Sequence, residues 1–163
     1  AYVRAELTVR STVEPHEAPV AQLAELVSKV VAIEGPIHID EVARRITTAF
    51  GKTKAGSRIV EATFQAVRQA LRQNPTLMQD GPFLMTQEQS AAPPVRDRSD
   101  ETGSLLKAAY IPPCEIVAAA ELVRQESGDV DGEELVRAVA RLMGFLRVGS
   151  ELSAAIYGAL PRS

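Results

Sequence analysis

The chain has 163 residues, a formal net charge of −3, a hydrophobic share of 45% and a charged share of 24%. This composition is ordinary for a soluble globular protein, and no apolar run approaches the roughly 20 residues that a membrane-spanning helix needs. The single cysteine, Cys114, excludes an internal disulfide and favours a reducing, cytoplasmic location. Because the chain begins with Ala1 rather than Met, we expect a fragment of a longer protein.

The amino-terminal part begins with an expected extended lead-in, residues 1–18. Pro19 then suits a helix start, and apolar residues recur at helical spacing until Glu34-Gly35-Pro36 ends the helix. Residues 37–39 are expected to be extended. Asp40 is the expected N-cap of the next helix.

This next helix is expected to bury Val42 and Ile46, with Arg44 and Arg45 pointing outward, and to end at Gly51 in a left-handed conformation. After a turn, Ser57 is expected to cap a third helix that runs to about Gln73.

Two short apolar runs, 76–79 and 83–85, flank Asp80-Gly81-Pro82, which predicts a β-hairpin. The order helix, short strand, helix, turn, helix, hairpin is that of a winged helix-turn-helix. The sequence therefore predicts a mainly α fold with a small β-hairpin, and a winged helix-turn-helix at residues 19–86.

Residues 87–104 hold two prolines, small residues and alternating charges, and are expected to be the linker between units. A second set of helices is expected over residues 105–163, opening at Pro112-Pro113, with helices at 133–143 and 150–160. Only three residues of the sequence follow residue 160, and we expect this copy to lack a wing.

The chain repeats itself at a shift of 93 positions without a gap. Identical residues fall in register at Gly35/Gly128, Glu41/Glu134, Arg44/Arg137, Gly51/Gly144, Gly56-Ser57/Gly149-Ser150 and Ala62/Ala155. Two copies are too few for a solenoid. We therefore predict one small folding unit used twice, the second copy being degenerate.

A resemblance extends over about residues 19–155. It is carried by Glu34-Gly35-Pro36-Ile37-His38, Glu41–Arg45, Gly51, Gly56-Ser57-Arg58-Ile59, Ile111-Pro112-Pro113 and Glu115-Ile116. The chain is similar to an uncharacterised domain family at the carboxyl-terminal end of large bacterial proteins described as superfamily-one DNA/RNA helicase-related. This resemblance implies an accessory module whose motor lies elsewhere in the parent protein, and it carries over no catalytic residue.

Catalytic and cofactor patterns are weak. Gly51-Lys52-Thr53 is not a phosphate-binding loop. Such a loop needs a glycine five residues before Gly51, where the chain has Ile46, and it follows a strand, whereas the sequence predicts a helix before Gly51. His16, His38 and Cys114 do not have the spacing of metal ligands. We therefore expect no catalytic residue, no cofactor and no metal.

Charge is distributed unevenly, since residues 44–73 carry seven Lys or Arg residues against Glu61 alone. Such a basic island favours contact with phosphate. In a helix-turn-helix the third helix enters the major groove and the preceding turn touches the backbone. The expected nucleic-acid-binding residues are Arg45, Lys52, Lys54, Arg58, Gln65, Arg68 and Arg72.

The second copy has lost much of this pattern, with Ala138, Phe145, Glu151 and Gly158 at the positions of Arg45, Lys52, Arg58 and Gln65. We predict that the first copy positions duplex or forked DNA for a helicase-like parent, and that the other domains of that parent are its partners. The alternative is a protein-interaction or structural module that does not contact nucleic acid. The hairpin, with Asp80 and no Lys or Arg, weakens the first interpretation.

Overall fold

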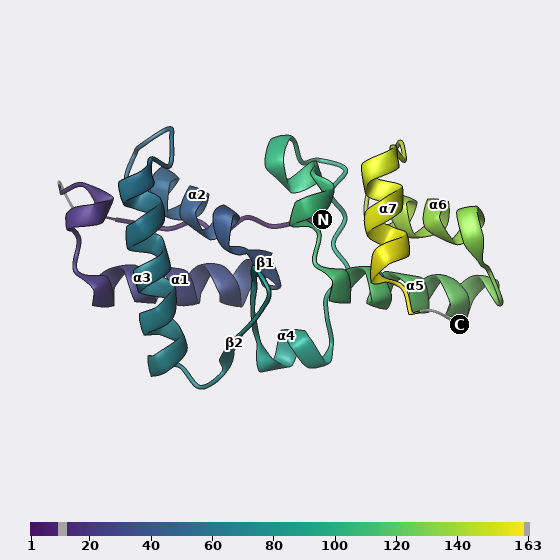
Figure 1. The fold of residues 1–163 in the computed structure, drawn as a ribbon, viewed down its shortest axis with the longest axis horizontal. Coiled ribbons are helices and arrows are strands. Elements are labelled where there is room, and N and C mark those ends of the chain that lie inside the picture. The colour runs from purple at the N-terminus through teal and green to yellow at the C-terminus, as the bar shows by residue number, and fades with distance from the viewer. Residues whose placement is uncertain (10–12, 162–163) are drawn as a thin grey trace. The chain divides into compact units, whose positions relative to one another are not determined.

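The computed structural model describes residues 1–9 and 13–161, and these residues divide into two compact units. The first unit is Val3–Glu88, and the second is Ala1–Tyr2 together with the chain from Gln89 onward. Residues 10–12 of the expected lead-in and 162–163 of the expected second copy lie outside the described residues. Each unit is mainly helical, and Figure 1 shows the ribbon of both.

The first unit has the element order that the sequence predicts. Its elements are a short 3-10 turn η1 (Pro15–Glu17), α1 (Val20–Glu34), β1 (Ile37–His38), α2 (Ile39–Ala49), α3 (Ser57–Gln73), β2 (Leu77–Asp80) and β3 (Phe83–Thr86). Helix α4 (Gln87–Ala91) follows and spans the boundary between the units. The expected helices and the hairpin are confirmed.

The strands form a three-stranded antiparallel sheet within the described residues, in the order β1-β3-β2. The hairpin register pairs Leu77 with Thr86 and Asp80 with Phe83, while β1 joins β3 through Ile37 and Leu84. Gly81 has a φ of +57° in the hairpin turn, a conformation that glycine adopts without strain.

The core of the first unit lies between α1, α2 and α3. Its fully buried side chains include Leu23, Val27, Val30, Val42 and Ile46. The lead-in belongs to this core, because Ala5 is buried and Leu7 and Val9 pack against the cluster. Residues 5–9 of the lead-in are therefore packed against the core of the first unit.

The second unit contains α5 (Pro113–Ser127), α6 (Gly132–Leu142) and α7 (Ser150–Ala159), preceded by short 3-10 turns η2 (Gly103–Leu106) and η3 (Ala108–Tyr110). Its core includes Ile116, Leu135, Val139, Met143 and Ile156.

The segment 87–104, expected as a linker, is mostly built into the second unit. Arg98 is only 2% exposed, and its guanidinium forms two hydrogen bonds of 2.6 and 2.7 Å with the buried carboxylate of Glu115. Tyr2 donates its backbone N–H to Asp97 O at 2.8 Å, and its ring lies under the guanidinium groups of Arg96 and Arg98. A buried, paired arginine fixes this segment, and the composition of the segment does not reveal that.

The 93-residue repeat is reproduced by the helix bounds. α5 and α6 have the same lengths as α1 and α2 and begin 93 positions later, and α7 begins 93 positions after α3. Buried residues coincide as well, in the pairs Leu23/Ile116, Val27/Ala120, Val30/Val123, Val42/Leu135, Ile46/Val139 and Ile59/Leu152.

The turn after the second helix is equally conserved between the copies. Gly51 and Gly144 have φ values of +75° and +90°, and their N–H groups donate to Thr48 O and Arg141 O at 3.0 Å. The repeat therefore encodes one local structure twice.

Two expected N-caps are corrected by one or two residues. The N-cap of α2 is His38, whose Nδ1 accepts the Asp40 N–H at 3.1 Å. The N-cap of α3 is Gly56, and Ser57 is its first helical residue. In the first case the imidazole takes the role that the sequence assigned to the Asp40 carboxylate.

Candidate nucleic-acid interface

The turn between α2 and α3 sets the direction of α3. Gly51 reverses the chain, and the Lys52 N–H donates to Thr47 O at 3.0 Å. α3 then buries Ile59, Thr63 and Ala66 against the core. Because helical residues three or four apart share a face, the opposite side of α3 faces solvent.

Six of the seven predicted site residues are exposed. Lys52 and Lys54 lie on the turn, and the others lie along α3 as Arg58, Gln65, Arg68 and Arg72. At 1.5 Å per helical residue, Arg58 and Arg72 are about 21 Å apart along the axis. The outward face of α3 is therefore a long, mostly cationic strip.

Part of this strip lines a shallow depression of about 470 Å³, with Val20, Glu61 and Gln69 beside Gln65, Arg68 and Arg72. Gln65 Nε2 lies 3.4 Å from Glu61 Oε1, and Arg72 donates to Gln69 Oε1 at 2.9 Å. These contacts orient the amides and guanidinium along the helix.

Lys52 forms an ion pair with Glu14, with Nζ 2.7 Å from Oε1 and both side chains largely exposed. Exposed pairs of this kind contribute about 0–1 kcal/mol and are screened by salt. The ammonium can therefore exchange Glu14 for another anion.

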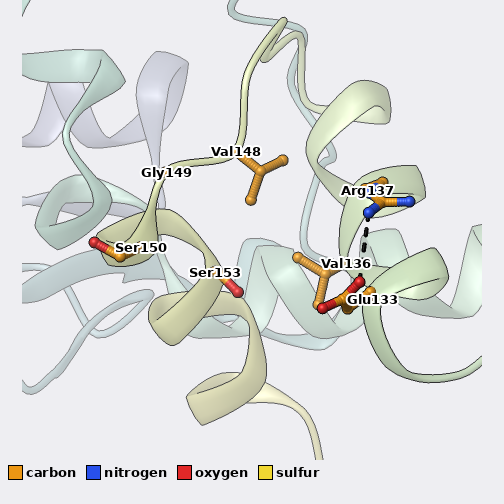
Figure 2. A pocket seen from close by; sticks show the side chains of 7 residues that line it. All are labelled: Glu133, Val136, Arg137, Val148, Gly149, Ser150 and Ser153. Carbon is orange, nitrogen blue, oxygen red and sulfur yellow. Dashed lines mark hydrogen bonds and ion pairs between the residues drawn. The ribbon is translucent and has the colours of Figure 1, made fainter.

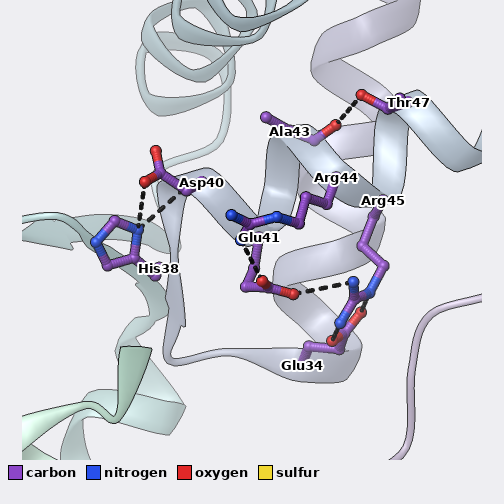
Figure 3. Close-up of polar contacts among 8 residues, drawn as sticks. All are labelled: Glu34, His38, Asp40, Glu41, Ala43, Arg44, Arg45 and Thr47. Atoms are coloured by element: carbon purple, nitrogen blue, oxygen red, sulfur yellow. Dashed lines mark hydrogen bonds and ion pairs between the residues drawn. The ribbon is translucent and has the colours of Figure 1, made fainter. Parts of the chain in front are cut away.

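Arg45 is the exception, and the expectation that it points outward is wrong. Its side chain is 8% exposed, and it donates from Nε and Nη2 to the two oxygens of Glu34, each at 2.8 Å. Nη1 lies 3.0 Å from Glu41 Oε2. Figure 3 shows Arg45 of α2 turned toward Glu34 at the end of α1, so Arg45 does not belong to the candidate interface.

The buried carboxylates around Arg45 were missed at the level of sequence. Glu34 is fully buried and also accepts the Ala5 N–H at 2.9 Å, while Glu41 is buried and bonds to Arg44 as well. A signal was present, because Glu34 follows Val30 and Val31 on the inward face of α1, and Arg45 lies three residues after Val42. Charged residues at core-facing positions indicate a buried pair.

His38 lies next to this cluster, and its ring meets Phe83 edge to face at 5.4 Å between centroids. Burial lowers the pKa of His38 below its ordinary value of 6.5, and Arg44 lowers it further, whereas Asp40 and Glu41 act in the opposite direction. The neutral imidazole is thereby favoured, which suits its role as the acceptor that caps α2.

The hairpin offers no cation to a nucleic acid. Residues 77–86 carry Asp80, which is exposed, and no Lys or Arg. The cations of α3 and its turn therefore have no counterpart on the hairpin.

The corresponding surface of the second unit has different chemistry. At the junction of α6 and α7, a depression of about 200 Å³ is lined by Val136, Val148, Gly149 and Ser150, with the pair Glu133–Arg137 at its edge (Figure 2). Glu151 is exposed at the position that Arg58 has on α3. The second unit keeps the scaffold without the cationic strip.

Other site types find little support in the described part of the chain. Within residues 1–9 and 13–161, no group of three or more His, Cys, Asp or Glu residues is arranged to hold a metal ion. Cys114 is half-buried in the first turn of α5. None of the helices in these ranges is long and apolar enough to cross a membrane.

Comparison with known protein families gives a match over part of the chain. Residues 13–61 match the model of a family described as "Protein of unknown function (DUF3320)". The match covers α1, β1, α2 and the first turn of α3, which is less than half of the chain. No curated protein and no solved structure matches the chain.

Proposed function

We propose that the first unit is a winged helix-turn-helix that binds duplex or forked DNA through the outward face of α3. The element order and the pairing of β1 with β3 support this architecture, with the hairpin as the wing. Function does not follow from such a fold alone, so the proposal depends on the chemistry of the surface.

The observation that carries the proposal is the exposure of the cationic strip. Lys52, Lys54, Arg58, Arg68 and Arg72 face solvent, with Glu61 as the acidic residue among them. The lysines of the turn would contact phosphates, as would Arg72 near the end of α3. Gln65 and Arg68 lie on the middle of the helix, where they would meet base edges in the major groove.

The unit would act as a non-catalytic accessory module. The helicase-like parent is inferred from the resemblance of residues 19–155, and the module would hold DNA for a motor in that parent. The second unit has the same helices without the cationic strip, and it would serve protein contacts. The two copies of one scaffold would then have different roles, the first in DNA binding and the second in protein contacts.

A rival function is a protein-interaction module that never touches nucleic acid. The acidic tip of the hairpin favours it, because Asp80 repels phosphate where a wing would approach the backbone. The pairing of Lys52 with Glu14 favours it as well.

A salt titration separates the two functions. Binding of the full chain to a fluorescein-labelled 20-base-pair duplex would be followed by anisotropy at increasing salt. The logarithm of the affinity should fall linearly with the logarithm of the salt concentration, with a slope of about −0.9 per phosphate neutralised. The double variant Arg58→Ala/Arg68→Ala should bind weakly and flatten this slope.

A matched control is the double variant Arg137→Ala/Arg141→Ala, which removes the same charge from exposed positions of α6. It should retain wild-type affinity. Equal losses in both variants would show attraction by net charge alone, and an absence of binding at low salt would leave the protein-interaction function.

A further inference from the structure

One acidic residue, Glu61, lies within the cationic strip of α3. It is exposed, and it is the one Asp or Glu among residues 44–73, which carry seven Lys or Arg residues. A carboxylate at this place weakens the attraction of the strip for phosphate, because like charges repel. A surface that bound phosphate alone would gain affinity from a neutral or basic residue at position 61.

Helical spacing places Glu61 among the side chains that would meet base edges. Arg58, Glu61, Gln65 and Arg68 follow one another at intervals of three or four residues, so they share one face of α3. Glu61, Gln65 and Arg68 also line the same shallow depression. In a helix-turn-helix, residues near the start of the recognition helix contact the base edges. Glu61 lies in the second turn of α3, which is such a position.

The carboxylate of Glu61 is open to a donor from outside the chain. Among the residues that the structure describes, Glu61 forms no ion pair, and its one hydrogen bond is the 3.4 Å contact with Gln65 Nε2. This contact is exposed and longer than a usual N–H···O bond. A carboxylate accepts several hydrogen bonds and donates none.

The four bases differ in what they present to such an acceptor. In the major groove, guanine presents two acceptors, thymine an acceptor and a methyl group, and adenine a donor beside an acceptor. Cytosine presents its N4 amino donor with no acceptor beside it on the same base. Since a carboxylate only accepts, it is attracted by cytosine N4 and repelled by the acceptor atoms of the other bases.

We propose that Glu61 makes DNA binding by α3 sequence-specific, by accepting the major-groove hydrogen of a cytosine N4 amino group. This inference rests on the proposed function, since it requires α3 to lie in the major groove. The cations of the strip would position the helix on the phosphates, and Glu61 would reject sites that lack the cytosine. The ligand is then a duplex of defined sequence, in which Glu61 determines one base pair.

The experiment first identifies a binding sequence. The full chain would select duplexes from a pool of 20-base-pair DNAs with a randomised centre, and the selected pool would be sequenced. An invariant cytosine is expected for the wild type. Glu61→Ala should accept other bases at that position, because the variant has no acceptor there.

An N4-methylated cytosine tests the contact at a single atom. The methyl group replaces the amino hydrogen that faces the major groove and leaves the pairing with guanine intact. Fluorescence anisotropy should show that the wild type binds the methylated duplex about tenfold more weakly than the unmodified one, as expected for one lost base contact. Glu61→Ala should bind both duplexes with the same affinity.

Glu151→Ala is the matched control, because Glu151 is an exposed glutamate in the first turn of α7. It removes the same charge from the second unit. This variant should select the same cytosine as the wild type and lose the same affinity for the methylated duplex. Far-UV circular dichroism would verify that both variants are folded.

Three results would overturn the proposal. Duplex binding without an invariant cytosine would leave the proposed function in place, as positioning that is independent of sequence. Tighter binding of every sequence by Glu61→Ala, with the base preference unchanged, would mean that Glu61 only repels phosphate. An absence of duplex binding at low salt would remove the proposed function itself, and this inference with it.

Discussion

The two units begin their three main helices at positions 93 residues apart, yet each buries a different ion pair. In the first, Arg45 of α2 pairs with Glu34 and Glu41. In the second, Arg98 of the segment 87–104, which precedes α5, pairs with Glu115 of α5. The apolar core is common to both copies, and the buried charges are not.

This difference shows what the buried charges do. Each of the carboxylates Glu34 and Glu115 also accepts a backbone N–H, from Ala5 and Arg96 respectively. A buried carboxylate must be paired, so its position fixes the path of a segment that has no regular secondary structure. The repeated sequence specifies the helices. The buried ion pairs specify the course of the segments that precede α1 and α5.

The largest expected effect comes from breaking these pairs. Arg45→Met removes the guanidinium that pairs with the buried carboxylate of Glu34, and Arg98→Met does the same to Glu115. Removing one partner of a buried pair costs about 3–5 kcal/mol. Urea denaturation monitored by circular dichroism should show this loss in the free energy of unfolding for each variant.

The control for this measurement is Arg137→Met, which removes an exposed pair with Glu133 at 3.4 Å. Its effect should be below about 1 kcal/mol. If Arg45→Met were as mild as this control, the buried network would not determine the path of the lead-in.

The paired glycines Gly51 and Gly144 give a smaller, graded effect. Alanine at either position must adopt a positive φ, which costs about 1–2 kcal/mol. A Cβ at Gly51 would meet open space, whereas at Gly144 it would lie 2.5 Å from Ser99 N and 2.6 Å from Arg98 N. Gly144→Ala should therefore cost a further 1–3 kcal/mol or so, as overpacking does.

Thermal or urea denaturation of the two alanine variants measures this difference directly. Equal losses would contradict the close approach of residues 97–99 to Gly144 in the second unit.

The smallest effect concerns pH and the cap of α2. The pKa of His38 is lowered in the folded state, mainly by burial, so the unfolded chain binds the proton more readily. The contribution of His38 to stability is therefore present above pH 6.5 and is lost as the pH falls from there through the lowered folded-state pKa. Protonated Nδ1 can no longer accept the Asp40 N–H, and a lost cap costs about 1 kcal/mol.

His38→Asn should reduce this pH dependence, because the asparagine oxygen accepts the same hydrogen bond at every pH. Stability would be compared by urea denaturation at pH 7.5 and pH 5. His16→Asn, which removes the other histidine of the chain, serves as the control and should retain the wild-type difference.

Much of this architecture was predictable because its signals are local. Proline and glycine mark the ends of α1, α2 and α6, and apolar spacing gives the buried face of each helix. The exposure of Arg58, Gln65, Arg68 and Arg72 follows from the same spacing, since it depends only on α3 having one buried side.

The predictions from sequence were wrong where a residue far away in the chain decides whether a side chain is buried or caps a helix. Arg45 turns inward because Glu34 lies across the α1–α2 junction, and Arg98 is buried because Glu115 accepts its guanidinium. The cap of α2 shifts to His38, whose ring also meets Phe83 of the hairpin. Periodicity places Glu34 and Arg45 at core-facing positions, but it does not show which charged residues pair.

The sequence by itself determined the helices, their duplication and the position of the cationic strip, because helical periodicity and helix-ending residues act within a few positions of the chain. Only the tertiary structure decided which charges are buried and how the segments that precede α1 and α5 are anchored to them. These outcomes depend on the free energies of desolvation and of pairing between charged residues far apart in the chain. Such residues come into contact only when the helices pack.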